Sequence, residues 1–295
     1  MGGITILDGG MSRELERCGA ELRQPEWSAL ALIEKPEAVL QAHRNFVQAG
    51  AQVVTTNSYA LVPFHIGAER FQRDALRLAA LSGKLARDAA DAVKGVRVAG
   101  SIPPLFGSYR PDLFDAGQAA ALLAPLIEGL SPHVDFWLVE TTSSLIEART
   151  VHAALTPTCK PVWLSFTLED APRDVPRLRS GESVADAAKL AVELGVDALL
   201  FNCSAPEVME EAVRVAARTC AENNARCPIG AYANAFVEKK DDGPLVANET
   251  ITQVRTDLSP ELYRDFAQTW INAGATLVGG CCGVGPAHIA ALRDL

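Results

Sequence analysis

The chain has 295 residues, of which 48% are apolar and 21% charged, an ordinary balance for a globular protein with a sizeable core. Its formal net charge of −9 lacks the basic footprint of proteins that bind nucleic acids or anionic membranes. No apolar run approaches the roughly 18 residues that cross a bilayer, and the first residues show no signal-peptide pattern. We therefore expect a cytoplasmic protein that acts on a small molecule.

Eight short runs of β-branched and apolar residues recur along the chain, each followed by a longer stretch of helical periodicity. The predicted strands are 4–10, 51–59, 96–102, 135–142, 161–167, 196–204, 228–234 and 275–282. They are almost continuously apolar, which is typical of parallel strands buried on both faces. Eight β–α units in a chain of this length predict a single (β/α)8 TIM barrel domain over residues 1–295. A doubly wound sheet is the alternative, but no GxGxxG turn follows the first strand.

Several of the intervening helices carry recognisable start signals. Pro36 and Pro286 stand where a first helical turn is expected, a position that proline tolerates well. Ser204 and Ser259, each just ahead of another proline, are expected to cap the helices that follow them.

Polar residues gather where the predicted strands end, and in a (β/α)8 barrel the chemistry lies at these carboxyl ends. The strand ends carry Asp8, Asn57, Ser101, Glu140, Thr167, Asn202, Cys203, Asn234, Cys281 and Cys282. The two longest irregular stretches, 101–115 and 236–258, also follow strands and would lie on the same face. The pattern predicts one site at this rim.

Three of the seven cysteines end neighbouring parts of the barrel. Cys203 ends the sixth strand, and Cys281 and Cys282 end the eighth, so their thiols can converge. Three thiolates can bind Zn²⁺ and leave one tetrahedral position open, as in catalytic zinc sites. We predict one Zn²⁺ per chain at this position, the alternative being that Cys203 is a buried apolar thiol and the adjacent pair binds nothing. The remaining cysteines are expected to be packing thiols: Cys18, Cys159, Cys220 and Cys227.

Asp8 and Glu140 are carboxylates at the ends of apolar strands. Glu140 is a poor helix cap, and Thr142 or Ser143 suits the start of the next helix better. A carboxylate buried there without an evident cation suggests a cationic ligand. Asp8 has a second possible role, as the cap of the helix that follows it.

Five segments together resemble the homocysteine S-methyltransferase family: LDGGMSRELERCG, AGAQVVTTNSYA, LVETTSSLIEA, FNCSAPEVM and GGCCGVGPAHIAAL. The resemblance runs from about residue 4 to the C-terminus, and its most specific part is the Asn-Cys of strand six combined with the Gly-Gly-Cys-Cys of strand eight. It implies a zinc-dependent barrel that methylates the thiol of homocysteine to give methionine.

The resemblance also implies roles for individual residues. It assigns Cys203, Cys281 and Cys282 as zinc ligands. It implies that Asp8, the Gly9 backbone and Glu140 hold the amino acid group of homocysteine. Family positions that are expected either to touch substrate or to support the residues that do are Asn57, Asn202 and Asn234.

Two loops over the barrel mouth, where a methyl donor would be bound, depart from the family pattern. Relatives often carry a Pro-Asn-Ser-Gly-like turn after strand seven, where this chain reads YANAF, and the stretch 101–115 is proline-rich where some relatives carry a longer insertion. Tyr109 and Phe236, on these loops, are candidate aromatic faces for a cation.

We expect a sulfonium donor, S-methylmethionine first and S-adenosylmethionine second. A negatively charged zinc–thiolate centre favours an onium methyl group, and no Gly-rich turn of the dinucleotide type is present to hold an adenosyl group. Betaine or a dimethylsulfonio compound is the alternative donor, although betaine-using relatives carry a C-terminal arm that is not seen here. From another class, the protein would be a non-catalytic zinc-binding or thiol-redox barrel.

Overall fold

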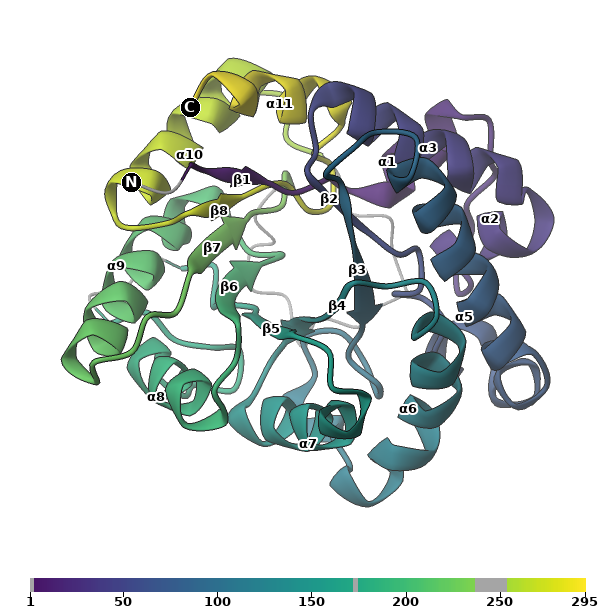
Figure 1. Cartoon of the computed structure of the whole chain (residues 1–295), viewed down its shortest axis with the longest axis horizontal. Coiled ribbons are helices and arrows are strands. Elements are labelled where there is room, and N and C mark those ends of the chain that lie inside the picture. The colour runs from purple at the N-terminus through teal and green to yellow at the C-terminus, as the bar shows by residue number, and fades with distance from the viewer. Residues whose placement is uncertain (1–2, 172–174, 237–253) are drawn as a thin grey trace.

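Eight parallel strands form one sheet that curls into a ring, with the helices outside it (Figure 1). The computed structural model describes residues 3–171, 175–236 and 254–295. The strands are β1 (Thr5–Ile6), β2 (Val53–Thr55), β3 (Arg97–Ile102), β4 (Phe136–Thr142), β5 (Val162–Phe166), β6 (Ala198–Asn202), β7 (Ile229–Tyr232) and β8 (Leu277–Val278). The predicted (β/α)8 barrel is confirmed, and the doubly wound alternative is wrong.

The helices alternate with the strands along the chain. The α-helices are α1 (Met11–Arg17), α2 (Ser28–Glu34), α3 (Pro36–Ala49), α4 (Pro63–Ile66), α5 (Ala68–Ala90), α6 (Ala116–Leu130), α7 (Leu145–Leu155), α8 (Val184–Leu194), α9 (Pro206–Glu222), α10 (Pro260–Asn272) and α11 (Pro286–Ala291). Short 3₁₀ helices are η1 (Pro111–Leu113), η2 (Thr156–Thr158) and η3 (Leu292–Asp294). Within the described ranges, none of these helices is both long enough and apolar enough to cross a membrane.

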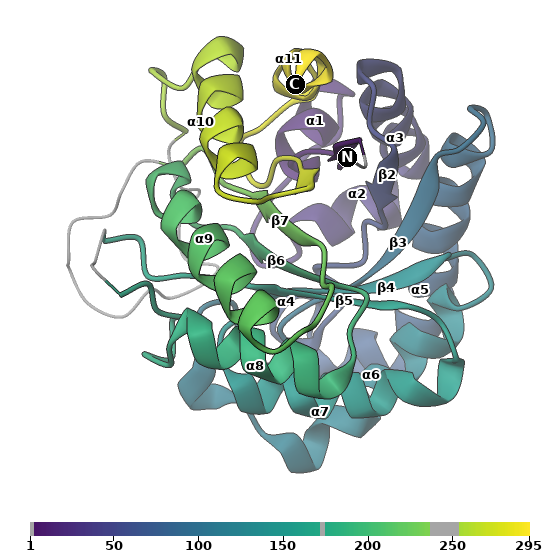
Figure 2. The ribbon, with the colours of Figure 1, turned by 60° about the vertical axis from the view of Figure 1, so that its left-hand side comes forward.

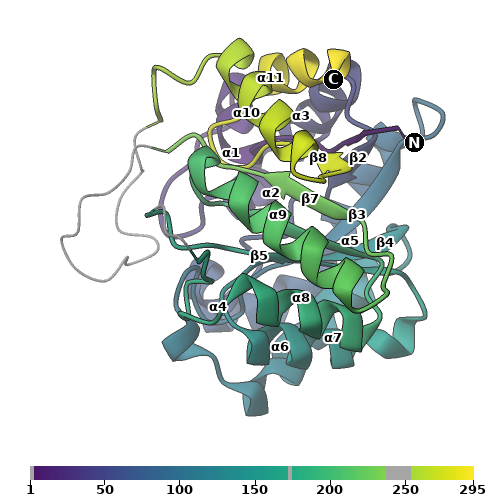
Figure 3. The same cartoon turned by 90° about the vertical axis from the view of Figure 1, so that its left-hand side faces the viewer.

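The helices cover the outer face of the barrel. In Figure 2, α7, α8 and α9 lie outside the strands β5, β6 and β7. Figure 3 shows α11, near the end of the chain, beside α10 and α3, and α11 packs against both. The last β–α unit therefore meets the first, which closes the outer layer.

The ring of strands is most lightly paired where it closes. The order is β1-β8-β7-β6-β5-β4-β3-β2, and β1 meets β2 through one parallel bridge between Leu7 and Val53. Gln52 reinforces this seam, because its backbone N–H donates to the Ile6 carbonyl at 2.7 Å and its side-chain oxygen accepts from the Ile6 N–H at 2.9 Å.

The inside of the barrel is filled with side chains toward its amino end. They come from alternate positions of the strands and include Leu7, Val53, Ala99, Phe136, Leu138, Trp163, Ala198, Leu200 and Leu277. Tyr232, the last residue of β7, belongs to the same cluster and lines the cavity at the other end. Arg97, the first residue of β3, covers this end: its guanidinium carbon lies 4.9 Å from the Phe136 ring centroid and 5.2 Å from that of Trp163. Since the amino end is packed, a ligand has to enter from the carboxyl end.

The predicted helix starts are confirmed in three places. Pro36 and Pro286 are the first residues of α3 and α11. The Ser259 hydroxyl caps α10 by accepting a hydrogen bond from the Leu262 N–H.

Two cap predictions are wrong. Ala205, not Ser204, stands at the cap position of α9, because the Ser204 hydroxyl accepts the Leu168 N–H at 2.8 Å from the neighbouring strand end. The cap of α7 is Ser144 rather than Thr142 or Ser143. In both cases the helix begins one or two residues later than the sequence pattern indicates.

The first and last strands are also shorter than predicted. β1 and β8 hold two residues each, because the chain leaves the ladder after Ile6 and after Val278 to form the rim. Of the predicted loop 236–258, residues 237–253 lie outside the described residues.

His43, on α3, is a polar side chain buried within the protein. It is fully buried, and neither ring nitrogen has a hydrogen-bond partner among the described residues. Burial lowers the pKa of its imidazole from the ordinary value of 6.5 to about 4. Between these values the unfolded chain binds a proton that the folded chain does not, so this residue lowers the free energy of unfolding as pH falls from 6.5 to about 4.

We predict that His43→Leu raises the free energy of unfolding near neutral pH by about 1–3 kcal/mol, the cost of an unsatisfied buried polar group. The variant should also lose less stability on acidification, because one proton-binding difference between the two states is gone. Urea unfolding near pH 7 and near pH 5 measures both effects. His43→Gln separates them: it should reduce the acid dependence without the gain near neutral pH.

Candidate active site

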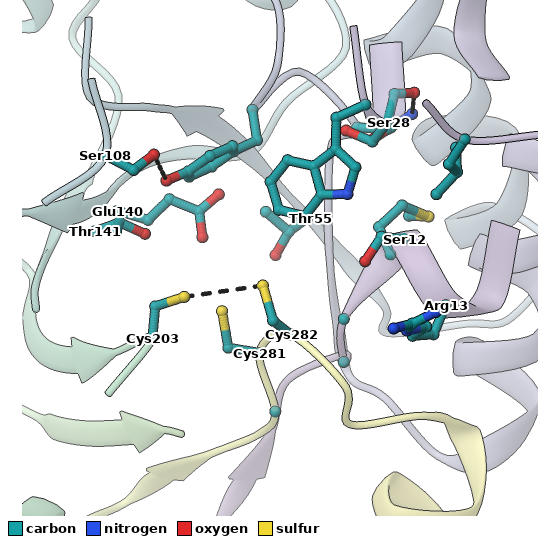
Figure 4. Close-up of a pocket in the computed structure, with 18 of the residues that line it drawn as sticks. Ser12, Arg13, Ser28, Thr55, Ser108, Glu140, Thr141, Cys203, Cys281 and Cys282 are labelled. Atoms are coloured by element: carbon teal, nitrogen blue, oxygen red, sulfur yellow. Dashed lines mark hydrogen bonds between the residues drawn. The ribbon is translucent and has the colours of Figure 1, made fainter. Parts of the chain in front are cut away.

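A cavity of about 220 Å³ opens at the carboxyl ends of the strands (Figure 4). Among the residues that the sequence singled out, those lining it are Asp8, Gly9, Asn57, Tyr109, Glu140, Cys203, Phe236, Cys281 and Cys282. Asn202 and Asn234 are not among the lining residues. Side chains from both ends of the chain therefore share one cavity.

The three strand-end cysteines converge in this cavity. Their sulfurs all lie within 4.8 Å of one another, and Cys203 Sγ is 3.9 Å from Cys282 Sγ. Figure 4 shows Cys203 approaching from one side and Cys281 and Cys282 from another, with the sulfurs directed toward a common point. Tetrahedral ligands about 2.3 Å from zinc are about 3.8 Å apart, so these sulfurs fit such an ion with little movement.

The cluster also favours a thiolate. Hydrogen bonds from Cys281 and Cys282 hold the pKa of the Cys203 thiol well below its usual range, although burial opposes this. Metal binding requires deprotonated thiols, and the neighbouring thiols already stabilise the first charge. None of the other four cysteines belongs to the cluster.

Close backbone approach between the segments that follow β1 and β8 brings the two ends of the chain together. The Gly280 N–H donates to the Asp8 carbonyl at 2.9 Å, and the Gly10 N–H donates to the Val284 carbonyl at 2.8 Å. A Cβ on Gly10 would lie 2.4 Å from the Cys281 carbonyl oxygen, and one on Gly280 would lie 2.1 Å from a Val284 methyl. Only glycine fits at these positions, and Asp8 and the cysteine pair therefore share one rim.

Asp8 is held by the neighbouring strand and does not cap a helix. Its carboxylate accepts the Thr55 N–H at 2.7 Å and the Thr55 hydroxyl at 3.0 Å, and α1 begins only after Gly10. Burial raises the pKa of Asp8 to about 7 despite these hydrogen bonds. The sequence left both roles open, and the observed contacts exclude the cap.

Glu140 is the second buried carboxyl of the cavity. It accepts a hydrogen bond from the Ser101 hydroxyl, and Figure 4 shows its carboxyl directed toward the space above the cysteines. Burial, aided by the nearby charge of Asp8, raises the pKa of Glu140 to about 8. Among the described ion pairs, none involves Asp8 or Glu140. The cavity therefore holds two buried carboxyls that have no cationic partner among the described residues.

A bulge in β4 aims Glu140, and Asn202 supports the bulge. The register between β4 and β5 shifts between Val139 and Thr142, and Thr141 has a φ of 57°. The Asn202 amide oxygen accepts the Thr141 N–H at 2.9 Å, and its amide nitrogen donates to the Thr141 hydroxyl at 2.9 Å. Bulges of this kind often redirect a side chain at a functional site. Asn202 is fully buried behind the cavity wall.

The other two asparagines hold loops. The Asn57 amide donates to the Ser28 carbonyl at 3.1 Å, which fixes the end of β2 against the start of α2. The Asn234 side chain accepts the Phe236 N–H at 3.1 Å, and its own N–H donates to the Ser204 carbonyl. Asn57 reaches the cavity surface, and Asn234 shapes the turn after β7.

Strained backbone concentrates at the cavity. Six described non-glycine residues have positive φ, and four of them line it: Trp27, Tyr109, Thr141 and Cys203. Such conformations cost about 1–3 kcal/mol each and persist where the surroundings over-determine them. The sequence did not indicate Trp27, because the segment before α2 has no strand or helix pattern to place it.

The chain belongs to the homocysteine S-methyltransferase family. The family model of that description matches residues 5–295. The chain is 32% identical to the homocysteine S-methyltransferase of Escherichia coli (strain K12), over 98% of this chain and 94% of the relative. It is 30% identical to homocysteine S-methyltransferase YbgG of Bacillus subtilis (strain 168), over 97% of this chain and 92% of the relative.

A solved structure supports the same assignment. The metallated form of the homocysteine methyltransferase MmuM from Escherichia coli aligns with a TM-score of 0.77 and 29% identity, covering 99% of this chain and 96% of that one. The family resemblance and the fold inferred from the sequence are both confirmed.

Proposed function

We propose that the protein transfers a methyl group from a sulfonium donor to the thiol of L-homocysteine, giving methionine, at one Zn²⁺ held by Cys203, Cys281 and Cys282. The observation that carries the proposal is the convergence of three thiols beside two buried carboxyls that lack a cationic partner among the described residues. A metal centre and an ammonium site next to each other fit a substrate that is both a thiol and an amino acid.

The three cysteines would supply a site with one open tetrahedral position. Zinc bound there would hold a substrate thiol as thiolate at neutral pH, where a free thiol with a pKa of about 8.5 is mostly protonated. Three thiolates and Zn²⁺ carry a formal charge of −1, so the substrate sulfur would stay electron-rich. No protein nucleophile is required.

Glu140 and Asp8 would bind the ammonium group of homocysteine. With no cation present, burial keeps the pKa of Glu140 at about 8 and that of Asp8 at about 7. An arriving ammonium favours the ionised carboxylates and reverses that effect. The Gly9 backbone, beside Asp8 in the cavity, would contact the rest of the amino acid group.

The three asparagines would contribute in different ways. Asn57 lies on the cavity wall, where it would contact a bound substrate. Asn202 would act through Thr141, by holding the bulge that aims Glu140. Asn234 would act through the turn that carries Phe236.

A sulfonium donor fits the outer part of the cavity. The formally negative metal centre attracts a cationic methyl donor, whose charge is lost in the transfer. Trp27 and Phe236 line the cavity and offer aromatic faces, each contact being worth about 0.5–2 kcal/mol for a cation. One face of Tyr109 is already covered by the Arg179 guanidinium, 5.0 Å from the ring centroid.

The first prediction concerns the metal. Protein purified under reducing conditions should contain about one Zn²⁺ per chain, and Cys203→Ala should lose both metal and turnover because a three-thiolate site loses a ligand. Elemental analysis and methionine formation measure these. Cys159→Ala, at an exposed thiol outside the cluster, is the matched control and should keep both. A Cys203→Ala protein that retains zinc and activity would refute the ligand set.

The second prediction concerns the acceptor. Glu140→Gln should raise the homocysteine KM by about two to four orders of magnitude, because removing one partner of a buried ion pair costs about 3–5 kcal/mol. Zinc content should be unchanged. Glu147→Gln is the control, since Glu147 is equally buried on the following helix but accepts the Ser143 N–H outside the cavity. Equal homocysteine KM values in the two variants would remove Glu140 from the binding site.

The third prediction concerns the donor. With zinc-loaded protein and homocysteine, kcat/KM should be highest for S-methylmethionine, lower for S-adenosylmethionine and lowest for betaine, because only sulfoniums combine a good leaving group with the cation that the centre attracts. Mass detection of methionine at equal donor concentrations gives the ranking, and a dimethylsulfonio compound tests the remaining alternative. Betaine as the best donor would overturn the sulfonium assignment. No methionine from any donor would instead favour a non-catalytic zinc-binding or redox role.

A further inference from the structure

Arg179 lies on the connection between β5 and α8, close to the cysteine cluster. Its guanidinium forms an ion pair with Asp170, with Nη2 2.6 Å from the carboxylate. The arginine side chain is only 14% exposed and the aspartate 31%, whereas the Arg149–Glu193 pair on the outer helices is 48% and 59% exposed. Burying an arginine costs free energy, so the chain holds this one in place through specific contacts.

The arginine stacks on the ring that touches a cysteine. Its guanidinium carbon is 5.0 Å from the centroid of the Tyr109 ring, and Tyr109 Oη is 2.9 Å from Cys203 Sγ. Tyr109 has a φ of 63°, an unfavourable conformation for a tyrosine. On the other side, Ser108 is fixed by a 2.7 Å hydrogen bond with Tyr59. The loop is therefore held in a strained shape that brings the hydroxyl to the sulfur.

The same ion pair reaches the backbone next to Cys203. Asp170 uses its second oxygen to accept the Ala205 N–H at 2.8 Å. Ala205 stands at the start of α9, two residues after Cys203, whose own φ is 52°. Arg179 and Asp170 thus contact the surroundings of Cys203 by two routes, one through the tyrosine and one through the main chain.

The connection that carries the pair is itself anchored. After β5, two antiparallel bridges join Leu168 to Leu178 and Arg177 to Ser183. The Arg179 N–H donates to the Thr167 carbonyl at 3.3 Å. These contacts hold the backbone of Arg179 against the end of β5, beneath the tyrosine ring that its guanidinium covers.

We infer that Arg179, fixed by Asp170, is a positioning residue for the metal ligand Cys203: it holds Tyr109 so that the phenol donates a hydrogen bond to the Cys203 sulfur. The inference rests on the proposed metal site. A thiolate can only accept, so the phenol is the donor once Cys203 is deprotonated. Groups that hydrogen-bond to metal ligands orient them, and their loss typically lowers metal affinity about 10–100-fold.

The planar guanidinium is essential to this arrangement. Arginine can pair with Asp170 at its edge and cover the tyrosine with its face at the same time, which a lysine ammonium cannot do. Lysine would keep the charge and the ion pair but leave the ring without its platform. Charge and positioning can therefore be separated by substitution.

The test uses the full-length protein loaded with Zn²⁺ or Co²⁺. Arg179→Gln and Tyr109→Phe should each lower Zn²⁺ affinity about 10-fold or more in competition with a chromogenic chelator. The thiolate-to-cobalt absorption band should move to longer wavelength in both, because a thiolate without its hydrogen bond gives up an electron more easily. Thermal unfolding of the metal-free variants checks that the fold is intact.

A double-mutant cycle decides whether the arginine acts through the tyrosine. The combined Arg179→Gln and Tyr109→Phe variant should bind Zn²⁺ no more weakly than the weaker single variant, since both remove the same hydrogen bond. Arg179→Lys should resemble Arg179→Gln in the cobalt band. Arg149→Gln, at the exposed pair, should match the wild type in every measurement.

Additive losses in the cycle, an unshifted cobalt band in Arg179→Gln, or full recovery in Arg179→Lys would each overturn the inference while leaving the metal site intact. A wild-type protein that binds neither ion would refute the proposed metal site and this inference with it.

Discussion

The close contact between the backbone after β1 and the backbone after β8 is the constraint on which the site depends. Gly10 and Gly280 let two segments from opposite ends of the sequence lie against each other, with hydrogen bonds of 2.8 and 2.9 Å across the contact. Asp8 and the Cys281–Cys282 pair reach one cavity only because of it. β1 and β8 pair through only two residues each, so the glycine contact continues their joining beyond the ladder.

Burial opposes the charged forms of the acidic groups beside this contact. Two carboxyls with raised pKa values and a thiol with a lowered pKa lie in one cavity. Hydrogen bonds from the neighbouring thiols stabilise the thiolate of Cys203. The carboxylates of Asp8 and Glu140 accept hydrogen bonds from hydroxyl and backbone groups, which only partly offset their lost hydration. Such opposed shifts in one cavity are typical of a site that binds charged ligands. Thr141 and Cys203 also have strained backbones with positive φ. Thr141 follows Glu140 and Cys203 carries a thiol, and both the carboxyl and the thiol point into the cavity.

Strand-end residues were predictable from the sequence. Among loop residues, Tyr109 and Phe236 were indicated as aromatic faces over the cavity, but the shapes of their loops were not. The eight apolar runs place Asp8, Glu140 and the three cysteines at one rim, because in parallel strands all carboxyl ends lie on the same side. Asn202 also ends a strand, but its side chain points into the wall, where both its amide oxygen and its amide nitrogen form hydrogen bonds with Thr141. A residue at a strand end can be placed at the rim from the sequence. The direction in which its side chain points near a bulge cannot be predicted in this way.

Trp27, Tyr109 and Arg179 lie on connections whose shapes depend on positive φ values and on contacts between distant loops. No local sequence pattern encodes those shapes, because neither tryptophan nor tyrosine favours the left-handed region. Ser204 shows the same limit on a smaller scale. Its position before a proline is typical of a cap, yet its hydroxyl accepts a hydrogen bond from the Leu168 N–H at the adjacent strand end instead of from the helix.

Cys203 and Cys282 are 79 residues apart in the chain, and their sulfurs are 3.9 Å apart in space. An ion shared by them would join two distant segments of the chain only in the folded state, where the sulfurs lie close together. Ligands that bind only the folded state stabilise it in proportion to the logarithm of their free concentration. The supply of metal would therefore set the lifetime of this barrel against unfolding and proteolysis, alongside its chemistry.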